Sequence, residues 1–515
     1  MFVPRHFLEA SNEANVPHYV AFPSRIPARL RIAQGWICGA SSGYISIVPS
    51  LPPVLIAGAG PCGIGCARAF QELGFDEWVI AEANSGAGGL AASIVDPQGF
   101  TWDQGGHVVF SHYGEFDRLV EEVLGDDVIR HERSSFIRIS DRWVPYPFQN
   151  NLHRLPADLA ESAILGLIEA QVSLRFSKPK QPWNQTSELL SDSGGQSFES
   201  WMMSMFGVGI VEQFMRPYNE KVWAHPLADM SAGWIAERVS VVDWESAVRS
   251  LVHSTDDVGW GPNNLFAFPR SGGTGQIFVQ AAELLGTKVQ YETRIVQVDV
   301  SSRIVTFSNG STLQYRDLIW TGHLDDLIAK LVDCPREVRT AAAELKHNSV
   351  TVVGMGYETP TKDDGSWFYF PEADVPFYRA TNFGKYSAGN LPGGRSDRYA
   401  AYMTEIASSP WRPLDRESLV TRVDKSLRQA ELVPSNAPLI SAHIIEVPYA
   451  YPIPTLGRDA ALRVIQPWLS AQRIFARGRF GAWRYEIGNM DHAVKMGADI
   501  ARRLVLGTPE EAWIE

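Results

Sequence analysis

The sequence has few cysteines and no apolar run long enough to cross a membrane. Its 515 residues include four cysteines, Cys38, Cys62, Cys66 and Cys334, which form neither a disulfide framework nor a C-x-x-C motif. A disulfide-stapled secreted scaffold is therefore excluded, and a reducing, cytoplasmic location is expected. A membrane span needs roughly 18 or more consecutive apolar residues, and because none occurs no membrane partner is expected.

An excess of positive charge is also missing. The formal net charge is -12 at pH 7, which argues against nucleic acid or an anionic membrane as a partner. An anionic ligand would need a local concentration of arginine. The chain is too long for one ordinary domain, so two or three packed units are expected. Residues 1–52 mix proline, serine, arginine and histidine without periodicity, which predicts a flexible N-terminal extension.

A glycine-rich turn near the start of the predicted core is the most informative motif present. Residues 54–57 form an apolar run, and Gly58, Gly60 and Gly63 follow in a G-x-G-x-x-G pattern. This pattern places backbone N–H groups and a helix N-terminus where a pyrophosphate can bind. A second apolar run ends at Glu82, 22 residues after Gly60, where a carboxylate can accept a hydrogen bond from a ribose hydroxyl. The sequence therefore predicts a dinucleotide site.

A second pair of glycines indicates that the dinucleotide carries a flavin. Gly88 and Gly89, followed by Leu90, let the backbone pass close to a bulky planar ligand, which flavoproteins need more often than nicotinamide enzymes. Residues 287–321 contain short alternating strands with Asn309-Gly310 as a hairpin signal. Hairpins inserted between glycine-rich segments are typical of a flavin-binding fold of the glutathione-reductase type.

The apolar periodicity divides the chain into three predicted parts of a mixed α/β fold. A discontinuous, Rossmann-like FAD-binding domain of the glutathione-reductase type is predicted from residues 53–112, 260–322 and 465–510. Apolar residues recur at a spacing near 3.6 within residues 150–259, which predicts a helical domain. The remaining residues, 113–149 and 323–464, are expected to form an antiparallel β-sheet substrate domain.

The segment from Asp103 to His112 contains the first candidate for chemistry. Two glycines precede His107 and permit a backbone that directs this side chain toward a flat ligand such as a flavin ring. A purely structural histidine is the alternative. No metal site is predicted, because His107 and His112 have no third ligand at a suitable spacing.

Two further segments each set one arginine among aromatic residues and prolines. Residues 214–223 contain Arg216, and residues 367–380 contain Arg379. An unpaired guanidinium is costly in such surroundings, so an anion could meet each arginine, and the pair could clamp a diphosphate. An arginine stacked on aromatic rings as a structural element is the alternative. A fourth segment, residues 477–492, precedes the last predicted helix and offers backbone N–H groups to a flavin.

These segments together resemble the UDP-galactopyranose mutases of the eukaryotic type over roughly residues 53–509. The shared motifs, in family order, are GAGPxGxG, GGL, GGHVxFSHY, WVPYPFQNN, FMRPYNxKVWA, GGTG, PFYRAT, YPxPTL and RGRFGxWRYExGNxDH. The resemblance implies an FAD-dependent isomerase that interconverts UDP-galactopyranose and UDP-galactofuranose by ring contraction. It further implies that only reduced FAD is active, that flavin N5 is the nucleophile on the anomeric carbon, and that NADPH is the reductant.

The resemblance also implies roles for individual residues. Catalytic roles would fall to His107, Arg216, Arg379 and Asn489. Binding of the UDP-sugar substrate would fall to Tyr146, Phe148, Gln149, Trp201, Tyr369, Tyr451 and Tyr485. Binding of FAD would fall to Gly58, Gly60, Gly63, Glu82, Gly88, Gly89, Leu90, Arg479 and Gly488. Arg133 and Ser135 lie on the segment that matches the family's mobile loop near its NADPH-binding region.

Two positions depart from the family pattern. Ser197 stands where an asparagine usually precedes a Phe-x-x-Trp segment, and Asp243 stands where a second asparagine is usual. These departures leave open the same chemistry on a different nucleotide-linked hexose. An oxidase of the flavin amine-oxidase class and a non-catalytic binder of nucleotide sugars are further alternatives. Assembly into a homo-oligomer is allowed by the resemblance.

Overall fold

The computed structural model describes residues 52–177, 195–235, 238–241, 244–258, 264–363 and 365–513. The predicted N-terminal extension therefore lies almost wholly outside the described residues, and Asp243 lies outside them too. The described residues all belong to one compact unit. None of the helices in these ranges combines the length and the apolar composition that a membrane span requires.

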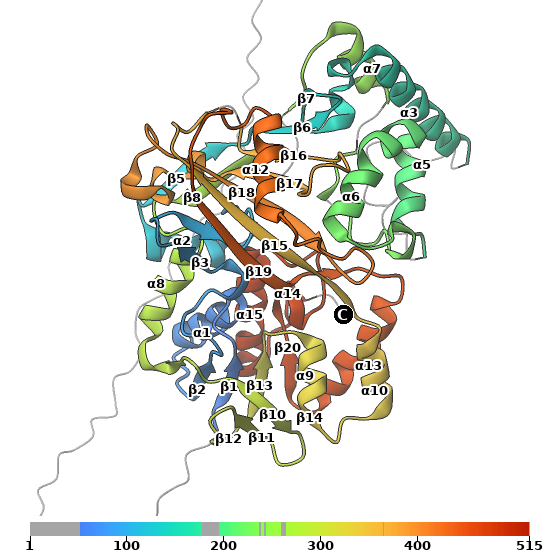
Figure 1. The fold of residues 1–515 in the computed structure, drawn as a ribbon. Coiled ribbons are helices and arrows are strands. Elements are labelled where there is room, and N and C mark those ends of the chain that lie inside the picture. Colours follow the sequence, from blue (N-terminus) through green and yellow to red (C-terminus); the bar gives the residue numbers. More distant parts are fainter. Residues whose placement is uncertain are drawn as a thin grey trace, which may run out of the picture. The chain divides into compact units, whose positions relative to one another are not determined.

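The predicted dinucleotide-binding unit contains a five-stranded parallel sheet (Figure 1). Its central strand, β1 (Val54–Ala57), is buried and pairs with β2 (Trp78–Ala81) and β13 (Asp317–Trp320). The edge strands are β9 (Val289–Gln290) and β20 (Ile474–Ala476), so the strand order is β20-β13-β1-β2-β9. Strands far apart in the sequence thus form one parallel sheet, which confirms the mixed α/β fold.

Helices α1 (Pro61–Glu72) and α15 (Met490–Leu506) pack closely against each other beside this sheet. Glycines permit the close approach, because a Cβ at Gly65 would lie 2.4 Å from the Val494 carbonyl oxygen and one at Gly497 would lie 2.0 Å from that of Cys62. Cys62 is a buried free thiol, and burial raises its pKa to about 12. A packing role for this cysteine is therefore favoured over a redox role.

Helices α2 (Gly114–Leu124) and α8 (Gly275–Leu285) complete the same apolar core. The sequence divided the chain after residue 112 and placed α2 with the substrate sheet. The structure instead packs Phe116 and Leu119 of α2 among the residues of α1 and α8. An apolar stripe shows that a helix is half-buried, but it does not show which sheet covers that stripe.

A seven-stranded sheet forms the predicted substrate part, in the order β19-β15-β18-β17-β16-β6-β7. Its longest strands are β15 (Lys346–Tyr357), β18 (Ala400–Ser408) and β19 (Leu439–Ile453). The remaining strands are β17 (Arg379–Asn382), β16 (Trp367–Tyr369), β6 (Ser135–Ile139) and β7 (Arg142–Pro145). All neighbours pair antiparallel except β16 and β6, which pair in parallel. Helix α12 (Leu419–Gln429) packs its apolar face on this sheet.

A small sheet and three helices pack on the face of the parallel sheet that carries Leu55 and Ala57 of β1, and they are drawn in the lower part of Figure 1. Its strands are β10 (Ile295–Asp299), β11 (Ile304–Phe307), β12 (Thr312–Gln314) and β14 (Leu331–Val332). Gly310 has φ +83° at the β11–β12 turn, which confirms the predicted Asn309-Gly310 hairpin. Helices α9 (Leu324–Lys330), α10 (Arg336–Ala343) and α13 (Arg458–Ala471) share its apolar core.

The described residues also contain the strand pairs β3 (Ser93–Val95) with β4 (Thr101–Asp103) and β5 (Val128–Glu132) with β8 (Leu265–Pro269).

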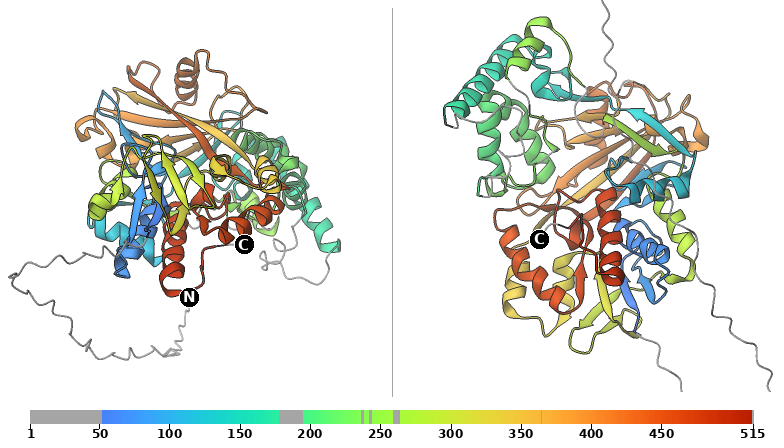
Figure 2. Two further views of the ribbon diagram at one scale, coloured as in Figure 1. Left: turned by 90° about the horizontal axis from the view of Figure 1, so that it is seen from below. Right: turned by 180° about the vertical axis from the view of Figure 1, so that it is seen from behind.

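In the described residues of the predicted helical part, four α-helices lie together, as both views of Figure 2 show. They are α3 (Ala157–Ser177), α5 (Phe198–Ile210), α6 (Arg216–Trp223) and α7 (Trp244–His253). A π-helical turn, Val211–Met215, joins α5 to α6. Glycines let α3 and α5 touch, since a Cβ at Gly209 would lie 2.1 Å from the Ser162 carbonyl oxygen.

Candidate active site

Two neighbouring cavities contain most of the predicted site residues. The first, of about 580 Å³, lies at the β1–α1 turn, and we call it the glycine-lined cavity. The second, of about 350 Å³, lies between α6 and the seven-stranded sheet, and we call it the arginine-lined cavity. The lining residues common to both are His107, Arg479, Asn489 and Met490. The two cavities therefore meet at these side chains.

The β1–α1 turn forms one wall of the glycine-lined cavity. Gly58, with φ +107°, and Gly60 line it at the N-terminus of α1. Gly63 does not line the cavity, because it has a packing role: a Cβ there would lie 1.9 Å from the Gly58 carbonyl oxygen. The wall thus presents backbone and the N-terminus of a twelve-residue helix, which suits a phosphate group.

Glu82 is held at the wall of the glycine-lined cavity by two backbone N–H groups. Its carboxylate accepts from Ala59 at 2.7 Å and from Asn84 at 2.8 Å. The side chain is buried, and the residue lines the cavity. A carboxylate has about four acceptor positions, so it can still accept from ribose hydroxyls.

The second glycine pair lies directly against the first turn. Gly88 and Gly89 have φ +113° and +53°, and a Cβ at Gly89 would lie 3.3 Å from Gly60 Cα. Gly89 and Leu90 line the cavity. Gly88 does not, because its missing side chain makes room for Ala92. Two side-chain-free turns, a buried carboxylate and a helix N-terminus fit a dinucleotide that carries a flat ring system.

His107 lies where the cavities meet. Its Nδ1 atom is buried and has no hydrogen-bond partner among the described residues, while its backbone N–H donates to Gly105 O at 2.7 Å. Burial, assisted by the nearby charge of Arg479, lowers the pKa of His107 to about 4. The imidazole is therefore neutral at pH 7, with one buried nitrogen available to a ligand.

Arg379 lines the arginine-lined cavity and is paired with a buried carboxylate on the neighbouring strand. Its guanidinium donates to both oxygens of Glu405 at 2.7 and 2.8 Å, and the Glu405 side chain is 1% exposed. The same carboxylate accepts from the Gly106 backbone N–H at 2.8 Å. Burial opposes ionisation, but Arg379 and Tyr378 hold the pKa of Glu405 below its usual value. Glu405 thus connects the arginine to the turn that presents His107.

Two arginines in the same cavity are not neutralised in this way. Arg479 donates to Gly488 O at 2.8 Å, and Arg238 donates to Glu486 O at 2.8 Å. Arg238 also lies over the Tyr485 ring, 4.6 Å from its centroid. Within the part of the chain that is described, neither guanidinium has a carboxylate within 4.0 Å. The cavity therefore has a local excess of positive charge, although the protein is acidic.

Arg216, the other predicted arginine, lines neither cavity. It is the first residue of α6, and its guanidinium pairs with Glu212, at 3.0 Å, and with Glu199 on α5. Glu212 lies one helical turn earlier, and this spacing brings the two side chains together on the outside of the helix. The structure thus does not bring Arg216 to the other site residues, and its role in diphosphate binding stays a prediction.

Five of the predicted substrate residues line the arginine-lined cavity: Tyr146, Gln149, Tyr369, Tyr451 and Tyr485. Phe148 and Trp201 do not. Phe148 is buried behind the wall against Phe214, with ring centroids 5.0 Å apart, and Trp201 packs against Phe206. Both are large apolar side chains that are buried in the core of the helical part, so they do not reach the cavity.

Ser197 caps α5 and does not line either cavity. Its hydroxyl accepts from the Ser200 backbone N–H at 3.2 Å, which is the usual task of a serine at a helix N-terminus. On the predicted reductant loop, Arg133 lines the arginine-lined cavity, 5.2 Å from the Tyr146 ring centroid, whereas Ser135 is buried on β6.

The arginine-lined cavity also contains large side chains that the sequence did not assign to the site, among them Arg238, Tyr218, Trp223 and Trp234. Trp223 and Tyr218 belong to the FMRPYNxKVWA motif, so that motif already contained a signal for them. Arg238 has no such signal, because it stands in a segment without motif or periodicity.

Comparisons with known proteins agree with this geometry. Residues 61–505 match the family model of flavin containing amine oxidoreductases. A reduced UDP-galactopyranose mutase of known structure is 35% identical, with a TM-score of 0.82, and the match covers 90% of this chain and 95% of that one.

Two other structures share the fold at low identity. A CLA-producing fatty acid isomerase from P. acnes is 13% identical with a TM-score of 0.60, covering 88% of this chain and 99% of its own. Cyclohexylamine oxidase from Brevibacterium oxydans IH-35A is 16% identical with a TM-score of 0.59, covering 88% and 98%.

Proposed function

The chain belongs to the UDP-galactopyranose mutase family, within the flavin containing amine oxidoreductases, and on this premise we propose that it interconverts UDP-galactopyranose and UDP-galactofuranose. The observation that carries the proposal is the meeting of the two cavities at His107, Arg479 and Asn489. One cavity suits FAD, and the other suits an anionic ligand with aromatic groups. Their junction provides one place where a cofactor and a sugar can react.

The residues that would hold FAD are Gly58, Gly60, Glu82, Gly89, Leu90, Arg479 and Gly488. Reduced FAD, when bound, supplies a nucleophilic N5 for the anomeric carbon of the sugar. We expect NADPH to provide the electrons, because Arg133, which lines the arginine-lined cavity, belongs to the segment that resembles the family's loop near its NADPH-binding region.

The arginines of the second cavity would compensate the charge of the diphosphate as it leaves the sugar. Arg238 and Arg479 have no carboxylate partner in the described chain, so their charge is available to an anion. Arg379 is already paired with Glu405, which fixes its position and weakens its net field. Preorganised cations in a desolvated cavity stabilise developing negative charge without reorganisation.

His107 would provide hydrogen bonding and not charge at the junction. Its pKa of about 4 keeps the ring neutral at pH 7, so Nδ1 can donate or accept one hydrogen bond according to the tautomer. A neutral ring does not compete with the arginines for the diphosphate, which leaves the leaving group on the arginine side of the cavity.

The tyrosines would orient the substrate. Burial raises the pKa of the Tyr146, Tyr369 and Tyr451 hydroxyls, so all three stay protonated and can donate to phosphate or sugar oxygens. Their rings line the arginine-lined cavity and would take space from water that could compete for the anomeric carbon.

The test is conversion by the reduced holoprotein. UDP-galactofuranose is incubated with protein reduced by dithionite or NADPH, and the products are separated by chromatography. Conversion to UDP-galactopyranose only after reduction is expected. If the reduced, flavin-loaded protein leaves the substrate unchanged, the proposal fails. A parallel panel of GDP- and dTDP-hexoses examines other nucleotide sugars, which the place of Ser197 outside the cavity does not favour.

A further inference from the structure

Two histidines and one aspartate form a compact cluster beside the arginine-lined cavity. His112 Nδ1 lies 2.8 Å from Asp491 Oδ2, and His492 Nδ1 lies 3.1 Å from Asp491 Oδ1. The three residues offer ligand atoms that all lie within 4.8 Å of one another. We propose that His112, Asp491 and His492 bind a divalent transition-metal ion of the zinc type.

The donor set determines the class of ion. Two imidazole nitrogens and one carboxylate oxygen are a usual set for Zn²⁺, whereas Mg²⁺ and Ca²⁺ prefer oxygen ligands. Tetrahedral zinc with bonds of about 2.0–2.1 Å holds its ligand atoms about 3.3 Å apart. In the cluster, the two imidazole nitrogens lie 2.8 and 3.1 Å from opposite oxygens of Asp491, and the three ligand atoms lie within 4.8 Å of one another, so side-chain rotation has to bring them to the spacing that one ion requires. The ion would replace the protons that the rings now share with the carboxylate.

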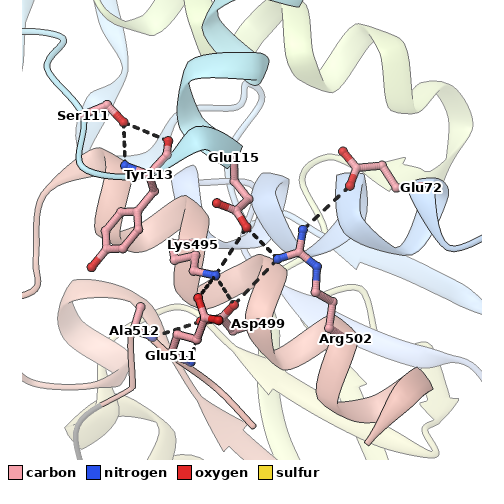
Figure 3. A network of polar contacts seen from close by, with 9 residues as sticks. All are labelled: Glu72, Ser111, Tyr113, Glu115, Lys495, Asp499, Arg502, Glu511 and Ala512. Carbon is pink, nitrogen blue, oxygen red and sulfur yellow. Dashed lines mark hydrogen bonds and ion pairs between the residues drawn. The ribbon is translucent and has the colours of Figure 1, made fainter. Parts of the chain in front are cut away.

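Asp491 and His492 are held on a rigid element. Both belong to the first turn of α15, and this helix is fixed one turn later by Lys495 (Figure 3). The Lys495 ammonium pairs with Asp499 at 2.9 Å, with Glu511 at 2.7 Å and with Glu115 of α2 at 3.3 Å. A ligand pair on a helix that is anchored to its neighbours keeps its geometry better than one on a free loop.

His112 is held in position by its own neighbours. Its backbone N–H donates to Asp491 Oδ2 at 3.1 Å, and the Ser111 hydroxyl donates to Tyr113 O at 2.9 Å, which closes the local turn (Figure 3). The Tyr113 ring meets the edge of His492 with centroids 5.3 Å apart. These contacts fix the backbone at His112 and one side of the His492 ring.

The exposure of the three side chains indicates how an ion would enter the cluster. The His112 side chain is 30% exposed, whereas Asp491 is 1% and His492 10% exposed, so an ion would enter past His112. Among the described residues the cluster has three protein ligands, and tetrahedral zinc takes a fourth, which water can supply.

A bound ion would change the charge at the cavity. Asp491 lines the arginine-lined cavity, where its single negative charge opposes an anionic ligand. A divalent cation on two neutral imidazoles and one carboxylate reverses the local charge from minus one to plus one. Tighter binding of UDP is the consequence, and this consequence alone rests on the proposed function.

Metal binding is tested directly on the full-length, flavin-loaded protein after removal of metals with a chelator. ZnCl₂ is titrated by calorimetry and CoCl₂ by absorbance at wavelengths beyond the oxidised flavin bands. One equivalent of each is expected, with tetrahedral cobalt bands and no response to MgCl₂. His112→Gln and His492→Gln are each expected to weaken zinc binding at least tenfold.

His153→Gln is the matched control, because His153 pairs with Asp256 at 2.9 Å and no third ligand is grouped with them among the described residues. Zinc binding is expected to be unchanged in this variant. Flavin content and thermal unfolding show whether each variant folds, and the exposed His112 position provides a variant that does not disturb the core. Absence of saturable zinc binding, or undiminished binding in a folded His112→Gln protein, would overturn the proposal.

A separate measurement tests the charge effect. The Kd for UDP is expected to fall several-fold with zinc present, and this gain is expected to disappear in His112→Gln. A Kd that does not respond to bound zinc contradicts the charge effect. Zinc binding by a protein that does not bind UDP would contradict the proposed function and support the metal site.

Discussion

The two cavities are built in opposite ways. Wall segments of the glycine-lined cavity are short and contiguous, such as the turn at Gly58 and Gly60 and the turn at Gly89 and Leu90. The arginine-lined cavity takes single side chains from α6, β16, β17, β19 and the start of α15. The shape of the glycine-lined cavity depends on positions that have no side chain. The arginine-lined cavity depends on charged side chains that come together from different elements. The first is therefore expected to be sensitive to added volume, and the second to a change of charge.

The largest effect is expected from Arg379→Met, because it leaves the Glu405 carboxylate buried without its cation. Breaking a buried ion pair from one side costs about 3–5 kcal/mol, so the free energy of unfolding in urea should fall by that amount. The double variant Arg379→Met/Glu405→Gln should recover part of it. Equal losses in the single and double variants would show that an isolated buried charge is not the cause.

The matched control for this pair is Arg395→Met. Arg395 pairs with Asp397 at 2.8 Å, but both side chains are more than half exposed. Surface pairs contribute about 0–1 kcal/mol. A loss comparable to that of Arg379→Met at this position would contradict the importance of burial.

Gly63→Ala tests sensitivity to volume in the glycine-lined cavity. The new Cβ would lie 1.9 Å from the Gly58 carbonyl oxygen, so the turn must move and the phosphate wall with it. We expect a loss of stability of up to about 3 kcal/mol and a more than tenfold lower flavin content after purification. The ratio of flavin to protein absorbance measures this.

Gly86→Ala is the control for that substitution. Gly86 lies in the loop between Glu82 and Gly88, and a Cβ there would meet nothing within 4 Å. Flavin content should stay within a factor of two of the unaltered protein. A similar loss in both variants would mean that the loop, and not the crowded turn, limits flavin binding.

Arg238→Met tests the charge of the arginine-lined cavity. Unlike Arg379, Arg238 has no carboxylate partner in the described residues that the substitution would leave unpaired. A charged hydrogen bond contributes about 1.5–3 kcal/mol, so the Kd for UDP should rise roughly 10–100-fold while flavin content is unchanged. Isothermal calorimetry measures the affinity. Arg249→Met on α7, whose side chain is 70% exposed, should leave the affinity unaltered. Loss of flavin in Arg238→Met would contradict the separation of the two cavities.

His107 stands between the cavities and gives a pH test. Its pKa of about 4 is below the ordinary value of 6.5, so between these values the unfolded chain binds a proton that the folded protein does not. Stability therefore falls as pH is lowered from 6.5 toward 4. Urea unfolding of the holoprotein at a series of pH values measures this fall. Over the same pH range, the free energy of unfolding of His107→Gln should fall by roughly 1–2 kcal/mol less than that of the unaltered protein. Parallel curves for the two proteins would contradict a buried neutral imidazole.

The difference between the cavities also explains what the sequence could predict. The β1 strand, the turn at Gly58 and the acid at Glu82 were recognised because each signal lies within a few residues. Glu405 was not, because its partner Arg379 lies 26 residues away and only the pairing of β17 with β18 brings them together.

At Arg216 the sequence identified the residue but not its partners. Its motif was recognised, but the side chains that surround it depend on the π-helical turn before α6 and on Glu199 of another helix. The cluster of His112, Asp491 and His492 was missed for the same reason, since His112 is 379 residues away from Asp491 in the chain. A motif identifies which residues matter, whereas their partners depend on tertiary structure.

The smallest effect is expected at Ser197, which departs from the family pattern and which the structure places at the cap of a helix. Ser197→Ala removes the hydroxyl that accepts from Ser200 N and should cost about 1 kcal/mol of unfolding free energy, because a cap is lost. Ser197→Asn should cost almost nothing, since asparagine caps helices as well as serine. Both variants should bind UDP and GDP with the same preference as the unaltered protein. If Ser197→Asn changes that preference while leaving stability alone, Ser197 belongs to the substrate site, and the boundary of the arginine-lined cavity must be extended to include α5.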